Sequence, residues 1–168
     1  MRMRVVLLSF AFIISFHFSM GQNLTIDAMR KEFSVANADS TTCANIYQKS
    51  LKDNSKDNTM NCYKGAISIT MAGFVKGGQE KLKLFKSGRT LLESAISNDA
   101  NNVELRFVRF TIQTSCPKLL GYNKEIKSDK EFILANYNHT SVPFLKSQMK
   151  EFLSHSAYLD DTEKQKLK

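Results

Sequence analysis

Few residues of this 168-residue chain have the types and spacing that catalysis requires. Cys116 and His139 are the one combination that could supply a thiol nucleophile and a base, but Cys116 directly precedes Pro117 and no third side chain is placed to orient the histidine. No zinc-binding spacing, glycine-rich phosphate loop, nucleophile elbow or Cys-x-x-Cys pair occurs. We therefore assign no catalytic residue, metal or cofactor, and expect a non-enzymatic protein with His139 and His155 at its surface.

Arg106 and Arg109 are the charged side chains that most need an explanation. At 100° per residue they project about 60° apart, on one flank of a predicted helix. Arginines beside a core helix need either water or a carboxylate. One interpretation pairs them with acids such as Glu93 or Glu104, or extends them to solvent. The other makes them contacts for an anionic ligand on a small concave surface.

The connection that follows, SCPKLLGYN, is short, apolar and turned by Gly121. Exposing Leu119, Leu120 and Tyr122 together would leave an apolar patch in water, so we expect the segment to pack back on the core. If any loop lines a binding site, it is this one; otherwise it is a structural plug. The candidate ligand- or partner-binding residues are therefore Arg106, Arg109, Leu119 and Tyr122.

The start of the chain has the layout of a secretory signal peptide. The sequence MRMR precedes an almost wholly apolar run, residues 5–18, which at about 14 residues is shorter than the roughly 20 of a membrane-spanning helix. Small residues follow and place cleavage between Gly21 and Gln22. We expect residues 1–21 to be a signal peptide and residues 22–168 to be periplasmic or secreted, with no stable membrane span after cleavage.

The size and charge of the remaining chain limit its organisation and partners. Residues 22–168 have the usual size of a single domain. The formal net charge of the whole chain is +8, and the lysines are spread along it instead of forming one block. In an exported protein this argues against nucleic acid as a partner and indicates a solvated surface.

Three cysteines lie in this domain, so at least one thiol is free or intermolecular. Cys43 and Cys62 are the nearest pair, and an oxidising compartment permits a disulfide between them. Each also lies in an apolar helical pattern, where cysteine is commonly just a small buried residue. Both interpretations of this pair stay open.

Apolar residues recur at helical spacing along most of the chain, and the sustained alternation typical of strands is missing. The sequence predicts an all-α fold of about six or seven helices, arranged as antiparallel hairpins stacked into a small irregular bundle. The first four helices are expected at residues 25–35, 42–52, 59–74 and 79–98. The third has an apolar stripe wide enough for two neighbours. Gly88 of the fourth indicates either a close helix crossing or simple tolerance of glycine.

The densest apolar pattern surrounds Asn101-Asn102. The sequence SNDANN stops one helix, and a new helix starts near Asn102. Two apolar sets project to nearly opposite sides of this new helix: Val103, Phe107 and Phe110, and Leu105, Val108 and Ile112. A helix with two apolar faces must be sandwiched. We therefore predict an αα-hairpin whose second helix is the centre of the stack.

Beyond Pro117 we expect two further helices and a short last one. Residues 128–131, SDKE, have the spacing of a capping box ahead of a helix that ends near Asn136. Pro143 lies in the first turn of the next helix. Asp160-Asp161 begins a polar segment, and about the last eight residues of the chain are expected to fray.

Two resemblances add to this interpretation. Residues 93–107, ESAISNDANNVELRF, resemble the junction between repeats of tetratricopeptide-type proteins, where a helix ending in alanine and acidic residues meets an Asn-rich turn. Residues 74–137 resemble small exported helical proteins of Bacteroidetes, which implies an origin and a fold and transfers no function. For that origin, Asp39-Ser40-Thr41 resembles the short O-glycosylation site of the phylum, so Ser40 is a candidate attachment site.

These observations lead to one main hypothesis. We expect an exported helical scaffold that binds a protein or peptide of the cell envelope through a groove between neighbouring hairpins. The alternative is a small-ligand binder or enzyme with a pocket near Arg106, Arg109 and Tyr122, and a purely structural envelope protein is a third reading. The sequence determines neither the partner nor the oligomeric state.

Overall fold

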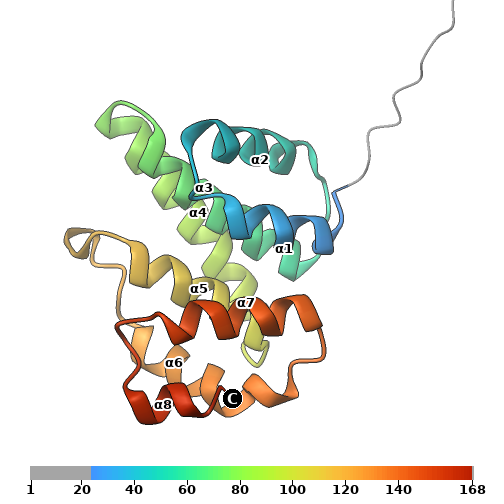
Figure 1. Ribbon diagram of the computed structural model, residues 1–168. Coiled ribbons are helices and arrows are strands. Elements are labelled where there is room, and N and C mark those ends of the chain that lie inside the picture. Colours follow the sequence, from blue (N-terminus) through green and yellow to red (C-terminus); the bar gives the residue numbers. More distant parts are fainter. Residues whose placement is uncertain (1–23, 168) are drawn as a thin grey trace, which may run out of the picture.

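The computed structural model describes residues 24–167, and within that range the regular structure is entirely helical (Figure 1). The predicted all-α class is therefore confirmed. The predicted signal peptide and its cleavage site lie outside the described residues. None of the described helices combines the length and apolar character needed to cross a membrane. The α-helices are α1 (Ile26–Val35), α2 (Ser40–Lys52), α3 (Asn58–Phe74), α4 (Gly78–Asn98), α5 (Val103–Ser115), α6 (Ile126–Asn136), α7 (Pro143–Ser154) and α8 (Asp161–Gln165), and the short 3₁₀ turns are η1 (Lys118–Leu120) and η2 (Tyr137–His139).

Short polar side chains determine where most of these helices begin. The residue before each of five helices accepts a hydrogen bond from a backbone N–H of the first turn: Thr25, Asp39, Asp57, Asn102 and Asp160. Helix α4 instead starts after Gly77, whose φ of 95° suits glycine. Pro143 occupies the first turn of α7, as predicted.

Helix α5 lies between two hydrophobic cores, which confirms the predicted two-faced helix. Leu105, Val108 and Ile112 belong to the core formed with α1 to α4. On the opposite side, Phe107 and Phe110 are buried in the core formed with α6 and α7, and Val103 packs against that core. Figure 1 shows α1 to α4 on one side of α5 and α6 and α8 on the other. Each half of the chain therefore buries its apolar surface against the same helix.

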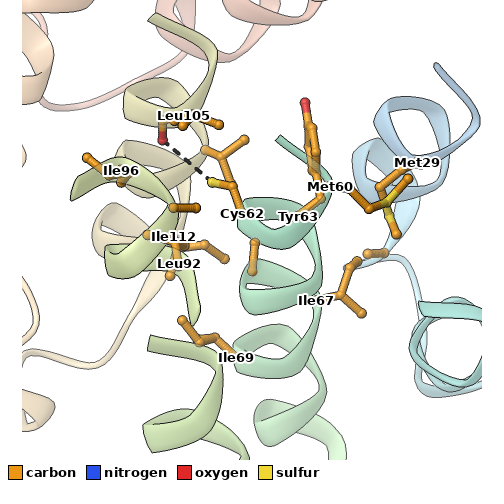
Figure 2. Packing of buried hydrophobic residues seen from close by; sticks show 14 of the residues in the cluster. Met29, Met60, Cys62, Tyr63, Ile67, Ile69, Leu92, Ile96, Leu105 and Ile112 are labelled. Atoms are coloured by element: carbon orange, nitrogen blue, oxygen red, sulfur yellow. Dashed lines mark hydrogen bonds between the residues drawn. The ribbon is translucent and has the colours of Figure 1, made fainter. Parts of the chain in front are cut away.

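Helix α3 is the axis of the N-terminal half. Its apolar stripe was expected to contact two neighbouring helices. In the structure, α3 packs against four helices: α1, α2, α4 and α5. In Figure 2, Met60 and Ile67 point toward Met29 of α1, while Ile69 lies on the side of Leu92. Nearly the whole circumference of α3 is thus buried, which explains why its sequence is the most apolar of the helices.

The close helix crossing at Gly88 is confirmed, and its partner is a second glycine, Gly65 of α3. A Cβ atom at Gly88 would lie 2.6 Å from the carbonyl oxygen of Gly65, and one at Gly65 would lie 2.6 Å from the carbonyl oxygen of Gly88. The backbones of α3 and α4 therefore touch directly. The hydroxyl of Ser68 adds a hydrogen bond of 3.0 Å to the carbonyl of Leu84 near the same crossing.

The C-terminal end docks on the second core. Asp160 and Glu163 form a capping box at α8, and Leu167, which follows the helix, is buried. Lys130 of α6 forms an ion pair with Glu163 at 2.7 Å. The polar C-terminal segment that contains α8 is thus attached by the side chain of Leu167 and by one ion pair. Fraying of the last residues stays a prediction.

We expect Gly88→Ala to lower the free energy of unfolding by about 1–3 kcal/mol or more, because a methyl group at this crossing meets backbone atoms that cannot move aside. Gly73→Ala in the same hairpin is the control. A Cβ at Gly73 meets no atom within 4 Å, so alanine should leave stability unchanged or raise it by up to about 1 kcal/mol. Urea denaturation measures both, and equal stabilities of the two variants would contradict the close crossing.

Candidate functional site

One flank of α5, the side that carries Arg106 and Arg109, is covered by a buried cluster of charged side chains. Asp129 of α6 is fully buried and accepts two hydrogen bonds from Arg109, each of 2.7 Å, and one of 3.0 Å from Arg106. Arg109 also donates to Glu93 of α4 at 2.7 Å. Burial opposes the charged form of Arg109, but its two carboxylate partners outweigh this effect and raise its pKa above the ordinary value. The cluster therefore ties α4, α5 and α6 together.

This cluster corrects the predicted capping box at residues 128–131. Helix α6 begins earlier, at Ile126, and Ser128 donates to Glu125 instead of capping a helix. Asp129 points into the protein because its carboxylate is the counter-ion of the two arginines. A local spacing rule cannot register a partner that lies about 20 residues away.

Tyr122 extends the same cluster into the loop after α5. Its hydroxyl donates a hydrogen bond of 2.6 Å to Glu93, and its side chain is buried, as predicted for the SCPKLLGYN segment. Burial first, and then the hydrogen bond to Glu93, raise the pKa of Tyr122 well above its ordinary value. Leu120 packs against the core, but Leu119 is 88% exposed, so the expectation that all three side chains pack inward is wrong for Leu119.

The second flank of α5 carries another buried carboxylate. Glu104 accepts hydrogen bonds of 2.7 Å from two nitrogens of Arg30 on α1, and one of 2.8 Å from the hydroxyl of Tyr63 on α3. The hydrogen bond to Glu104 is the largest of the effects that raise the pKa of Arg30. Of the two acids expected to pair with Arg106 or Arg109, Glu93 does pair with Arg109, whereas Glu104 pairs with Arg30 of α1.

Farther along this second flank, the two halves of the protein separate and leave a cavity of about 750 Å³, called the junction cavity below. Its walls come from α1, α3, α4, α5, η1 and α7. Apolar side chains from five of these helices dominate the lining: Phe33, Ile69, Phe85, Ile112, Phe144 and Phe152. A volume of this size lies within the range of about 300–1,000 Å³ that is usual for ligand pockets.

Three of the hydroxyls that line the junction cavity are already hydrogen-bonded within the protein. The hydroxyls of Thr70, Thr111 and Ser115 donate to carbonyls of their own helices. In residues 24–167, the buried side-chain oxygens without a hydrogen-bond partner belong to Glu32 and Gln113, which do not line the cavity. The cavity therefore suits an apolar occupant.

The predicted binding residues divide between the two flanks. Arg106, Arg109 and Tyr122 lie outside the lining of the junction cavity and have carboxylate partners within the protein. Leu119 lines both this cavity and a second hollow between α4 and η1. The second hollow is lined by Leu82, Phe85, Lys86, Arg89, Thr90, Glu93, Leu119 and Leu120. The aromatic residues of the cavity were missed as a site, because an apolar stripe looks the same in sequence whether it faces a core or a cavity.

The cysteines and histidines have no arrangement that suggests catalysis. Cys43, Cys62 and Cys116 are free thiols, so the structure contains no Cys43–Cys62 bond. The thiol of Cys62 lies 3.9 Å from the carbonyl oxygen of Leu105 (Figure 2), and burial raises its pKa. His139 and His155 are exposed, as predicted. Within the described part of the chain, no three His, Cys, Asp or Glu side chains are grouped to hold a metal ion.

Ser40 is exposed at the first position of α2. The preceding Asp39 caps this helix and binds Thr41 and Thr42 through hydrogen bonds of 2.7–2.9 Å. The Asp-Ser-Thr sequence thus has a structural use at a helix start, and O-glycosylation of Ser40 stays a prediction.

Comparison with protein families, with curated proteins and with solved structures gives no match for this chain.

We expect Asp129→Ala to lower the free energy of unfolding by about 3–5 kcal/mol, because it removes the main counter-ion of a buried arginine. Glu131→Ala is the control on the same helix: Glu131 is exposed and has no recorded partner, so the change should stay within about 0.5 kcal/mol. Chemical denaturation of both variants measures the difference. Similar stabilities would show that the cluster contributes little.

We also expect stability to fall above about pH 10. Burial raises the pKa of Tyr63 and Tyr122, so the folded protein keeps protons that the unfolded chain has lost at this pH. The stabilising contribution is complete below the unfolded pKa and decreases as the pH rises beyond it. Urea midpoints between pH 8 and 11 should show a shallower decline for Tyr122→Phe than for the unchanged protein. An identical decline would exclude Tyr122 as a contributor.

Proposed function

We propose that this protein is a non-enzymatic helical scaffold, exported to the cell envelope, that binds a segment of another protein or a peptide in the junction cavity. The observation that carries the proposal is the cavity itself, a large apolar space at the meeting point of the two cores. Burying apolar side chains of a partner there would be favourable, because about 25 cal/mol is gained for each Å² removed from water.

The surroundings of the cavity support binding in preference to nucleophilic catalysis. Cys116 is the one thiol in the lining, and burial raises its pKa, which keeps the reactive thiolate scarce. The cavity also has a size that suits a small apolar molecule, which is the second candidate occupant. The proposal also includes export, a Bacteroidetes origin and the likeness to tetratricopeptide repeats. These three parts of the proposal are inferred from the sequence alone.

Filling the cavity should weaken binding strongly without unfolding the protein. Gly73 lines the cavity, and a Cβ atom there meets open space, so Gly73→Phe can place a ring inside. We expect this variant to bind the neutral probe N-phenyl-1-naphthylamine about tenfold more weakly or worse, equivalent to at least about 1.4 kcal/mol. Gly73→Ala adds little volume and is the matched control. Probe fluorescence measures binding, and urea denaturation should show no loss of stability in either variant.

Cys116 provides a second readout. Cys43 and Cys62 are buried, whereas Cys116 is half-buried and faces the cavity, so a maleimide should modify Cys116 first. Bound probe should slow this modification in the unchanged protein. If Gly73→Phe binds the probe normally, or if the probe leaves Cys116 equally reactive, the junction cavity is not the binding site.

A further inference from the structure

The apolar surface of the junction cavity continues beyond its opening. Leu82 of α4 and Leu119 of η1 line both the cavity and the second hollow, so they connect the two. Leu82 is 47% exposed and Leu119 is 88% exposed. A small molecule confined to the cavity would contact both leucines from the cavity side only and would leave the sides that face the second hollow in water. An occupant that covers them must extend across the surface, as a segment of a protein does.

The need to hydrogen-bond its peptide groups decides the conformation of such a segment. The cavity hydroxyls at Thr70, Thr111 and Ser115 already donate within their own helices. Residues 24–167 contain no β-strand and so present no strand edge to pair with. The junction cavity and the second hollow together are called the trough below. An extended segment entering it would lose water from most of its peptide groups and could pair with few side chains, chiefly the amides of Asn37 and Gln148. A helix satisfies these groups internally, so it is the favoured form.

The charged residues beside the trough indicate which side chains the bound partner helix carries. Lys81 lines the cavity, and Lys86 and Arg89, which belong to the same helix α4, line the second hollow. None of the three forms an ion pair with a described residue, although Arg89 stacks over the ring of Tyr122 at 4.8 Å. The carboxylate that lines this hollow, Glu93, is already engaged by Arg109 and Tyr122. The border of the trough is therefore positive and available for a partner.

We infer that the occupant is an acidic amphipathic helix of a partner protein. Its apolar side chains enter the junction cavity and cover Leu82 and Leu119. Carboxylates along its flank face Lys81, Lys86 and Arg89. This inference depends on the proposed function, because it names the kind of segment that the cavity binds.

Synthetic peptides test the inference directly. Two labelled peptides share leucine and phenylalanine at helical positions i, i+3, i+4 and i+7, and differ in having glutamate or lysine on the flanks. We expect the acidic peptide to bind about tenfold more tightly at low salt, since exposed ion pairs are individually weak but several form together. The ratio should approach one in high salt. An acidic peptide with a central proline, which cannot stay helical, should lose most of its binding.

Charge reversal on α4 tests the acidic preference, and a charge reversal on α7 is the control. The double variant Lys81→Glu with Lys86→Glu should prefer the basic peptide, because the border of the trough then carries carboxylates. Both lysines are exposed and their side chains form no ion pair with a described residue, so the change should not disturb folding. Lys150→Glu makes one such charge change outside the lining of either hollow and should keep the original preference. Fluorescence anisotropy measures each dissociation constant.

The outcomes separate this inference from the proposed function. If both peptides bind equally and Gly73→Phe abolishes both, the cavity binds proteins but without the acidic preference, and the inference fails alone. If the proline peptide binds as well as the helical one, the helical occupant is wrong. If neither peptide binds while a fatty acid displaces N-phenyl-1-naphthylamine, or while sedimentation shows a dimer that Gly73→Phe dissociates, the inference and the peptide-binding proposal both fail.

Discussion

A helix whose charged side chains are enclosed by neighbouring helices must find a partner for each of these charges, and α5 carries three. Glu104 and Arg109 are buried, and Arg106 is largely covered. An uncompensated charge in such a place costs several kcal/mol. The protein meets this constraint with carboxylates and arginines from distant segments, so that α5 is bonded through Asp129 to α6 and through Glu104 to α1. The same pairs that compensate the charges determine how the two halves sit on their common helix.

The two flanks of α5 differ in how completely they are filled, and this difference creates the candidate site. On one flank, Asp129, Glu93 and the buried Tyr122 occupy the space between α4, α5 and α6. On the other flank, the short hydroxyl side chains of Thr111 and Ser115 leave the space between α1, α4 and α7 empty. Since these hydroxyls are satisfied by their own helix, the empty space remains apolar. A site for an apolar segment thus arises where two cores meet but do not fuse.

Much of the fold could be predicted because its signals are local or periodic. Thr25 and Asn102 cap helices that were expected to begin at or near them. The second helix begins at Ser40, slightly before its predicted start, because Asp39 caps it. The two apolar sets of α5 required a sandwiched helix, and both sets face cores. The failures have one common cause: Ser128 to Glu131 fitted a capping rule and Leu119 fitted a packing rule, but Asp129 has a distant partner and Leu119 borders a cavity. The aromatic lining of the junction cavity could not be predicted as a site either, because it also depends on contacts between distant segments.

The sequence by itself determined the helical class, the approximate helix boundaries and the burial of α5 from two sides, because hydrophobic periodicity and capping depend on residues within a few turns of each other. Only the tertiary structure decided which acid pairs with which arginine, that Gly65 meets Gly88, and that Phe33 and Phe144 face an open space. Each of these depends on contacts between segments far apart in the chain. Periodicity specifies which face of a helix avoids water, but what meets that face is set by the packing of the whole chain.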